Sequence, residues 1–229
     1  MAEADYGASD AAPQHLPPPC HEPLQLLWQD DDLLIVNKPA FLLSVPGRGP
    51  LKQDCVINRL ARQFAGVLLV HRLDLDTSGL MVFARHRSAQ AHLARCFQQR
   101  QVDKEYRARV AGLVACDHGD IDLPIAADWA NRPRQKISTE GKSALTRYRV
   151  LARDPEQDST LLALHPLTGR SHQLRIHMRE LGHPIIGCDL YAPPEIMARS
   201  PRLLLHACRL ALPHPNGSLQ EWHCPAPFH

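Results

Sequence analysis

The sequence predicts one folded domain of the α+β class. Short apolar segments with the alternation of half-buried strands recur along the chain, and three segments repeat apolar residues at helical spacing. No internal repeat or long linker separates them, and 229 residues suffice for one well-filled core. We therefore expect the domain to span residues 24–229, after a flexible, acidic and proline-rich segment at residues 1–23.

Six strands are predicted within this domain. In the clearest of them the side chains Tyr106, Ala108 and Val110 alternate with Arg107 and Arg109, which is the pattern of a strand with one buried face. The predicted strands cover residues 33–37, 80–85, 104–114, 145–151, 160–165 and 202–212.

Three helices are predicted between the strands. The first two are expected to begin at the N-caps Asp54 and Ser88, and the third covers residues 172–181 and stops before Gly182. The apolar residues expected on the buried faces are Val56, Leu60 and Phe64 in the first, Ala89, Leu93, Cys96 and Phe97 in the second, and Leu174, Met178 and Leu181 in the third.

Basic charge is concentrated in the predicted domain. Residues 1–32 hold seven acids and no Lys or Arg, so residues 33–229 carry 26 basic side chains against 17 acids, a net charge of +9. Two windows, residues 85–109 and 130–149, each carry a net charge of +5. Such windows are typical either of ordinary solvated faces or of a surface that binds a polyanion such as nucleic acid.

The sequence indicates neither a membrane protein nor a secreted protein. The uncharged apolar runs are far shorter than the roughly 18–20 residues that a membrane-spanning helix needs. The N-terminus lacks the basic and apolar regions of a secretory signal, and seven cysteines scattered singly are typical of free thiols in a reducing compartment. We expect a cytoplasmic protein that does not associate with a membrane.

Metal-dependent and nucleotide-dependent chemistry is poorly supported. Gly141-Lys142-Ser143 resembles the end of a phosphate-binding P-loop, but Lys136 stands where that motif needs its first glycine. Asp74 and Asp76 form an Asp-x-Asp pair of the kind found in magnesium-dependent nucleases, yet no second acidic cluster offers further oxygen ligands. We expect no metal site.

One polar block is the strongest candidate for a catalytic loop. Residues 71–85, HRLDLDTSGLMVFAR, place an acid at the entry to an apolar strand, where functional side chains are commonly displayed. A guanidinium at Arg72 would favour an ionised Asp74, as a nucleophile or base requires at neutral pH. The alternative is an ordinary loop, in which Asp74 or Asp76 caps the amides of Thr77 and Ser78.

A second block combines basic side chains with the predicted third helix. Residues 167–183 read LTGRSHQLRIHMRELGH, which is rich in Arg and His for a segment with a clear apolar face. Arg175 is expected either to pair with a buried acid from another segment or to form a surface salt bridge.

These two blocks carry a resemblance to a known family. The sequence HRLDLDTSG is similar to the catalytic signature H-R-L-D-x-x-T-S-G of the RluA family of RNA pseudouridine synthases, and residues 167–188 resemble that family's later motif T-G-R-x-H-Q-L/I-R-x-H. Shorter matches occur at residues 34–39, 104–106 and 203–207, and the similarity extends from about Leu26 to Pro227.

The resemblance implies a fold and a reaction. The fold is the pseudouridine synthase fold, an α+β arrangement with a mixed, mostly antiparallel central sheet, flanking helices and a cleft across the sheet. No N-terminal S4 domain is expected. The reaction breaks the C1′–N1 bond of a uridine in RNA, turns the uracil and rejoins it through C5, with no cofactor and no metal.

The resemblance also assigns roles to individual residues. Asp74 is implied as the catalytic aspartate, acting either on C1′ as a nucleophile or on the C2′ hydrogen as a base, with Arg175 as its ion-pair partner. Tyr106 is implied as a ring-stacking residue and a candidate general base at C5, and Arg72 would enter the space that the flipped uridine leaves. The other residues assigned to RNA binding are His71, Thr77, Arg132, Arg134, Lys136, Arg170 and His172.

The implied partner is RNA, bound by a monomer. The expected substrates are a hairpin loop of 23S rRNA and the anticodon stem-loop of some tRNAs. On the residues alone, a non-catalytic RNA-binding protein and a metal-dependent nuclease remain as alternatives. An isomerase neither shortens its RNA nor is inhibited by EDTA, which separates it from a nuclease.

Overall fold

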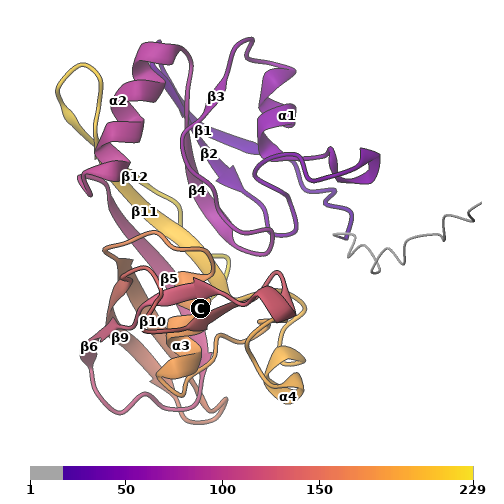
Figure 1. The fold of residues 1–229 in the computed structure, drawn as a ribbon, viewed down its shortest axis with the longest axis vertical. Coiled ribbons are helices and arrows are strands. Elements are labelled where there is room, and N and C mark those ends of the chain that lie inside the picture. Colours follow the sequence, from indigo (N-terminus) through magenta and orange to yellow (C-terminus); the bar gives the residue numbers. More distant parts are fainter. Residues whose placement is uncertain (1–17, 229) are drawn as a thin grey trace, which may run out of the picture.

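A ten-stranded sheet forms the centre of the computed structural model, which describes residues 18–228 (Figure 1). The main path of the sheet runs β1-β2-β4-β11-β5-β10-β9-β6, with β12 paired to β11 and β3 paired to β4. These strands are β1 (Gln25–Gln29), β2 (Leu33–Lys38), β3 (Leu68–Leu69), β4 (Ser78–Ala84), β5 (Asp103–Ala111), β6 (His118–Asp122), β9 (Leu145–Asp154), β10 (Ser159–Pro166), β11 (Leu205–Pro213) and β12 (Leu219–His223). Among the strand pairs of the described residues only β4 and β11 run parallel, so the predicted mixed, mostly antiparallel sheet is confirmed.

Helices cover both halves of the sheet, as expected. Helices α1 (Val56–Ala61) and α2 (Arg87–Gln98) lie on the half that contains β1 to β4, whereas α3 (Gln173–Glu180) and α4 (Pro194–Met197) lie by the other half (Figure 1). Short 3₁₀ turns, η1 (Pro50–Lys52) and η2 (Trp129–Asn131), and a separate two-stranded hairpin of β7 (Ile125–Ala127) and β8 (Gln135–Ile137) complete the described part.

The core explains why β2 and β4 are almost wholly apolar. Alternate side chains of these strands point to opposite faces. Leu33 and Val82 pack with Leu93 of α2 on one face, while Leu34 and Met81 pack in a second cluster with α1 on the other. Because both faces are covered, β4 is buried along its whole length. A third cluster joins β5, β9 and β10 to α3.

The two halves of the sheet meet at the parallel pair β4–β11. Only two residue pairs hold it, His206 with Ser78 and Ala207 with Gly79. Gly79 has φ +113°, and a Cβ there would lie 2.3 Å from the carbonyl oxygen of Ala207, so this position requires glycine. The seam therefore places the loop that precedes β4, residues 71–77, between the two halves.

Some predicted element ends were wrong. The strand predicted to reach residue 114 ends at Ala111, because the chain turns at Gly112 with φ +78°. The strand predicted over residues 202–212 begins at Leu205. Neither predicted N-cap residue stands at the N-cap position. Cys55 occupies that position in α1 without a capping hydrogen bond from its side chain, and His86 caps α2 with a ring nitrogen that accepts from the amide of Ala89.

The predicted flexible segment lies largely outside the described residues. Of residues 1–23, only 18–23 are described; Arg59 of α1 donates hydrogen bonds to the carbonyl oxygens of Cys20 and Glu22 at 2.6 and 2.7 Å. No helix within residues 18–228 is long and apolar enough to cross a membrane.

Candidate active site

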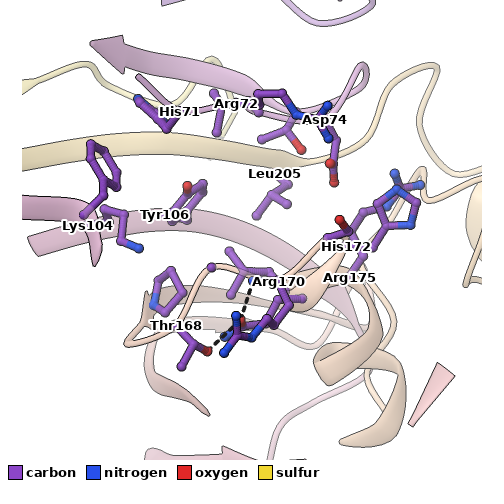
Figure 2. A pocket seen from close by; sticks show the side chains of 18 residues that line it. His71, Arg72, Asp74, Lys104, Tyr106, Thr168, Arg170, His172, Arg175 and Leu205 are labelled. Atoms are coloured by element: carbon purple, nitrogen blue, oxygen red, sulfur yellow. Dashed lines mark hydrogen bonds between the residues drawn. The ribbon is translucent and has the colours of Figure 1, made fainter. Parts of the chain in front are cut away.

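A cleft opens at the seam between the two halves of the sheet. It consists of two adjoining pockets of about 350 and 470 Å³ that share Arg72, Asp74, His172 and Arg175 in their walls. Figure 2 shows the Asp74 carboxylate pointing into this cleft, with Tyr106 of β5 among the side chains that line it. Pockets of this size accept a nucleoside-sized ligand. The predicted cleft across the sheet is therefore present.

The backbone on both sides of Asp74 is tied to a neighbouring segment. The Ser44 hydroxyl donates to the carbonyl oxygen of Leu73 at 2.7 Å and accepts from its amide at 3.1 Å. Lys38, at the end of β2, donates from Nζ to the carbonyl oxygen of Leu75 at 2.9 Å. These bonds fix the residues before and after Asp74, so the direction of the carboxylate is set by buried contacts.

Lys38 is the more unusual of these two anchors. Its side chain is fully buried, and Nζ also donates to the carbonyl oxygens of Pro39 and Leu42 at 2.9 and 2.7 Å. Burial lowers the pKa of Lys38 to about 7, against the opposing charges of Asp76 and Asp74. The amine therefore donates to three carbonyl oxygens, and each of these hydrogen bonds is lost when the amine is removed.

Replacement of Lys38 by methionine is expected to destabilise the fold by about 2–4 kcal/mol at pH 7, because three buried carbonyls lose their donor. The effect depends on pH. The pKa of Lys38 is about 7 in the folded protein, against an ordinary value of 10.5 in the unfolded chain. Between these pH values the unfolded chain binds more protons, so the free energy of unfolding of the wild type rises with pH. Urea unfolding from pH 7 to 9 should show this rise, at most about 1.4 kcal/mol per pH unit, reduced in Lys38→Met. Equal slopes for both proteins would contradict the assignment.

Arg175 is buried, and the close ion pair with Asp74 that the resemblance implies is not formed in this structure. Its guanidinium donates from Nη1 to Asp76 at 3.4 Å and from Nη2 to Asp189, and its Nε lies 3.3 Å from Sγ of Cys188. Within the described residues no ion pair of 4 Å or less joins Arg175 to Asp74. Burial disfavours the charge of Arg175, yet the surrounding negative groups, Asp74 among them, raise its pKa overall. Arg175 therefore acts on Asp74 at longer range while Asp76 and Asp189 hold it.

The two carboxylates of the Asp-x-Asp sequence occupy different environments. Asp76 faces Arg175, and burial raises its pKa against the opposing effect of that guanidinium. Among residues 18–228, neither Asp74 nor Asp76 belongs to a group of three possible metal ligands. Within the described residues such a group is formed by Asp30, Asp32 and His214, in which His214 already contacts the Asp30 carboxylate at 2.9 Å.

The ordinary-loop alternative is also not observed. In the part of the chain that the structure describes, the carboxylates of Asp74 and Asp76 accept no hydrogen bond from the amides of Thr77 or Ser78. Arg72 is exposed, lines both pockets, and forms no ion pair within 4 Å with an acid of residues 18–228. Its side chain is therefore available to a ligand in the cleft.

Two aromatic rings of the cleft are uncharged. Burial, and then the charge of Asp74, raise the pKa of Tyr106, so its phenol stays protonated at neutral pH. Burial lowers the pKa of His71 to about 3, and its ring stacks on Phe97 with centroids 4.8 Å apart. The environment of Tyr106 thus favours a stacking role over that of a resident base, and the His71 ring lines the cleft in its neutral form.

A buried glutamine shapes the turn that leads into α3. Gln173 accepts from the Thr168 hydroxyl at 2.7 Å and from the Arg170 amide at 3.0 Å, and it donates to the Leu145 carbonyl and the Thr146 hydroxyl at 3.0 Å each. All four hydrogen bonds fix residues 168–170 against β9. This explains the spacing of Thr, Gly, Arg and Gln in the second sequence block.

The predicted RNA-binding residues fall into two groups. His71, Arg72, Thr77, Arg170 and His172 line the pocket that contains Asp74, where the structure brings them together. The other three, Arg132, Arg134 and Lys136, are exposed on and beside the β7–β8 hairpin and line neither pocket. Their neighbour Pro133 does line the pocket that contains Asp74 and Asp189, so the hairpin borders the cleft.

Sequence reasoning assigned no role to the residues that support the site. Lys38, Ser44, Gln173, Asp189 and Tyr191 act through other side chains or the backbone, and nothing in local sequence shows such contacts. Tyr191 illustrates this: its hydroxyl accepts from the amide of Gln135 at 2.8 Å and lies 2.7 Å from Nδ1 of His172. The one available signal was the lysine of Asn37-Lys38-Pro39, a charge directly after an apolar strand.

The fold and the cleft together define a class of protein. A carboxylate, a neutral tyrosine ring and basic side chains face one cleft in a basic domain, as expected of an enzyme that modifies one unit of a nucleic acid. Residues 32–180 match the RNA pseudouridylate synthase family. The chain belongs to this family and is an RNA pseudouridine synthase, an isomerase.

Named relatives agree with this assignment over nearly the whole chain. The chain is similar to the dual-specificity RNA pseudouridine synthase RluA of Yersinia pestis, with 49% identity over 89% of this chain and 99% of the relative. It is 46% identical to that of Escherichia coli K12 over 92% of this chain and 97% of the relative. Among solved structures, human RNA pseudouridylate synthase domain containing 1 matches with a TM-score of 0.79 and 31% identity over 93% of this chain and 87% of that one.

Proposed function

We propose that this enzyme modifies uridines in both a hairpin loop of 23S rRNA and the anticodon stem-loop of some tRNAs, in the cytoplasm. The relatives that match 97–99% of their own length carry the description dual-specificity RNA pseudouridine synthase. The observation that carries the proposal for the site is the position of Asp74, whose carboxylate points into a nucleoside-sized cleft beside Tyr106 and Arg175.

The reaction needs a carboxylate at the sugar and room for the base to turn. The C1′–N1 bond breaks, the C1′–C5 bond forms, N1 gains a proton and the C5 proton leaves to solvent, so no oxidant or reductant is consumed. Asp74 acts either as a nucleophile at C1′ or as a base at the C2′ hydrogen. Both routes bring the sugar to the part of the cleft that Asp74 shares with the positively charged Arg175.

The target uridine must leave its stack before Asp74 reaches it. Extrusion of a base costs a few kcal/mol of stacking, and a side chain that enters the vacated space offsets part of this cost. Arg72 is suited to this role because it is exposed at the mouth of both pockets and has no acid partner within 4 Å among residues 18–228. Tyr106 then stacks on the flipped uracil.

Release of tritium from C5-labelled uridine tests the proposed function directly. Wild-type enzyme is expected to release tritium from both 23S rRNA and tRNA substrates in the presence of EDTA, without shortening either RNA. Release from one RNA alone would contradict the dual specificity. Binding without release from either RNA would contradict the assigned reaction, and cleavage that EDTA stops would indicate a nuclease.

RNA binding is expected to weaken steeply with salt, since the β7–β8 hairpin brings three exposed basic side chains to the edge of the cleft. Replacement of Arg132, Arg134 and Lys136 by alanine should reduce the slope of log K against log salt by about 2. Filter binding between 50 and 300 mM KCl measures both slopes. An unchanged slope would show that these residues form only a solvated surface.

A further inference from the structure

The loop that joins β7 to β8 presents a large aromatic side chain to solvent. Trp129 is 72% exposed, against 43% for Trp28, the other exposed aromatic side chain among the described hydrophobic residues. It packs in none of the three core clusters, and its indole donates no hydrogen bond within residues 18–228. Trp129 therefore contributes no core packing to the fold, although an exposed indole is unfavourable in water.

One face of this indole is already covered by a cation. The guanidinium carbon of Arg132 lies 3.9 Å from the centroid of the Trp129 ring, a close cation–π contact. Because most of the side chain remains accessible with Arg132 in place, the opposite ring face is open. An open aromatic face next to Arg132, Arg134 and Lys136 is the combination with which proteins bind unpaired nucleobases and their phosphates.

The loop that carries Trp129 is held in place. The amide of Asp128 donates to the carbonyl oxygen of Arg134 at 3.0 Å and closes the loop, and the amide of Asn131 donates to the Asp128 carbonyl oxygen at 3.1 Å. At the start of β8 the Gln135 amide is bonded to the Tyr191 hydroxyl. Ring stacking on a fixed support loses less conformational entropy than stacking on a mobile loop.

The loop is also fixed relative to the reaction site. The Tyr191 hydroxyl that holds Gln135 lies 2.7 Å from Nδ1 of His172, which lines the pocket of Asp74, and Pro133 lines the adjoining pocket. Trp129 thus stands four residues from Pro133 of the cleft wall, on a loop that Tyr191 links to a second residue of that wall, His172.

We propose that Trp129 is a second nucleobase site, where an unpaired base of the substrate loop other than the target uridine stacks on the ring face opposite Arg132. The inference rests on the proposed function, since it requires an RNA loop in the cleft. Its consequence is a preference for substrates with an unpaired base at a fixed offset from the target. Stacking tolerates any base identity, so the site selects loop shape more than sequence.

The test combines a protein variant with an RNA variant. In the inactive Asp74→Asn background, Trp129→Ala is expected to weaken binding of an anticodon stem-loop by about 5- to 100-fold, and Trp129→Phe by less, because phenylalanine retains a smaller stacking surface. Each loop position of the RNA is then replaced in turn by an abasic nucleotide. At one position this change should weaken binding to the protein that retains Trp129 but cause little further loss of affinity in Trp129→Ala. Trp28→Phe, on β1 and outside both pockets, is the matched control.

Tryptophan fluorescence gives a second readout that does not depend on affinity. RNA should quench the emission of the parent protein, and the quenching should be lost in Trp129→Phe but kept in Trp28→Phe. Equal affinity of Trp129→Ala and the parent, or additive effects of the two changes at every loop position, would overturn the inference. Tritium release by the enzyme that retains Asp74 distinguishes that outcome from failure of the proposed function, because in the second case no tritium would be released.

Discussion

The Asp74→Asn variant is expected to lose at least about 10⁴-fold in turnover while it binds RNA as tightly as wild type or more tightly. Asparagine has nearly the same shape, but at neutral pH it neither attacks C1′ nor removes the C2′ hydrogen. Binding persists because it depends on phosphate contacts by basic side chains, and loss of one negative charge in the cleft favours a polyanion. Single-turnover tritium release and filter binding measure the two quantities separately.

The backbone around Asp74 makes this variant a clean comparison. Ser44 and Lys38 hold Leu73 and Leu75 through main-chain atoms, so these contacts do not change with the side chain of residue 74. Asp117→Asn is the matched control, an exposed acid that pairs with Arg153 away from the cleft. Turnover within tenfold of wild type would remove Asp74 from the chemistry, and loss of RNA binding would give it a binding role instead.

The sequence predicted best those elements whose residues are buried on both faces. The apolar runs at β2, β4 and β10 are long enough to identify strands without any knowledge of their partners. Strands β6 and β8 were missed because they contain polar, partly exposed residues and exist through pairing with β9 and β7. Their stability lies in non-local hydrogen bonds, which leave little trace in local composition.

The predicted starts of α1 and α2 were wrong for a related reason. Asp54 is a preferred N-cap residue, but its carboxylate accepts two hydrogen bonds from Arg59 at 2.6 and 2.8 Å and does not cap α1. At α2 the ring of His86 accepts from the amide of Ala89, and Ser88 lies inside the helix with its hydroxyl 2.8 Å from the same ring. In both places the observed hydrogen bond involves a side chain that residue preferences for the N-cap position do not take into account.

At the site, the sequence predicted which residues meet but not how they pair. Arg175, Asp74 and Tyr106 do line one cleft. The ion pairs of Arg175 with Asp76 and Asp189 depend instead on how the chain after α3 folds back to bring Asp189 to Arg175. Asp189 comes 14 residues after Arg175, outside the helical spacing at which side chains of one helix meet, so its role required the fold.

The Arg175→Met variant is expected to lose about 10²- to 10³-fold in turnover, because the carboxylates it holds move and Asp74 loses a nearby positive charge. It should also be less stable by about 3 kcal/mol, since Asp76 and Asp189 are left without their cation. Burial already raises the pKa of Asp76, and the loss of Arg175 raises it further. The defect in stability should therefore shrink at low pH, where Asp76 is protonated and needs no partner.

Arg179→Met is the matched control for this prediction. Arg179 lies one turn further along α3 with a side chain that is 40% exposed, pairs with Glu180, and stands 5.6 Å from the Tyr191 ring just as Arg175 does. It shares the helix and the aromatic contact but not the carboxylates of the cleft, so its loss should change turnover by less than about threefold. Urea unfolding at pH 5 and pH 8 measures the stability of both variants, and tritium release measures their turnover. Near-normal turnover in Arg175→Met, or equal losses in both variants, would show that the link from Arg175 to Asp76 and Asp189 does not position the catalytic aspartate.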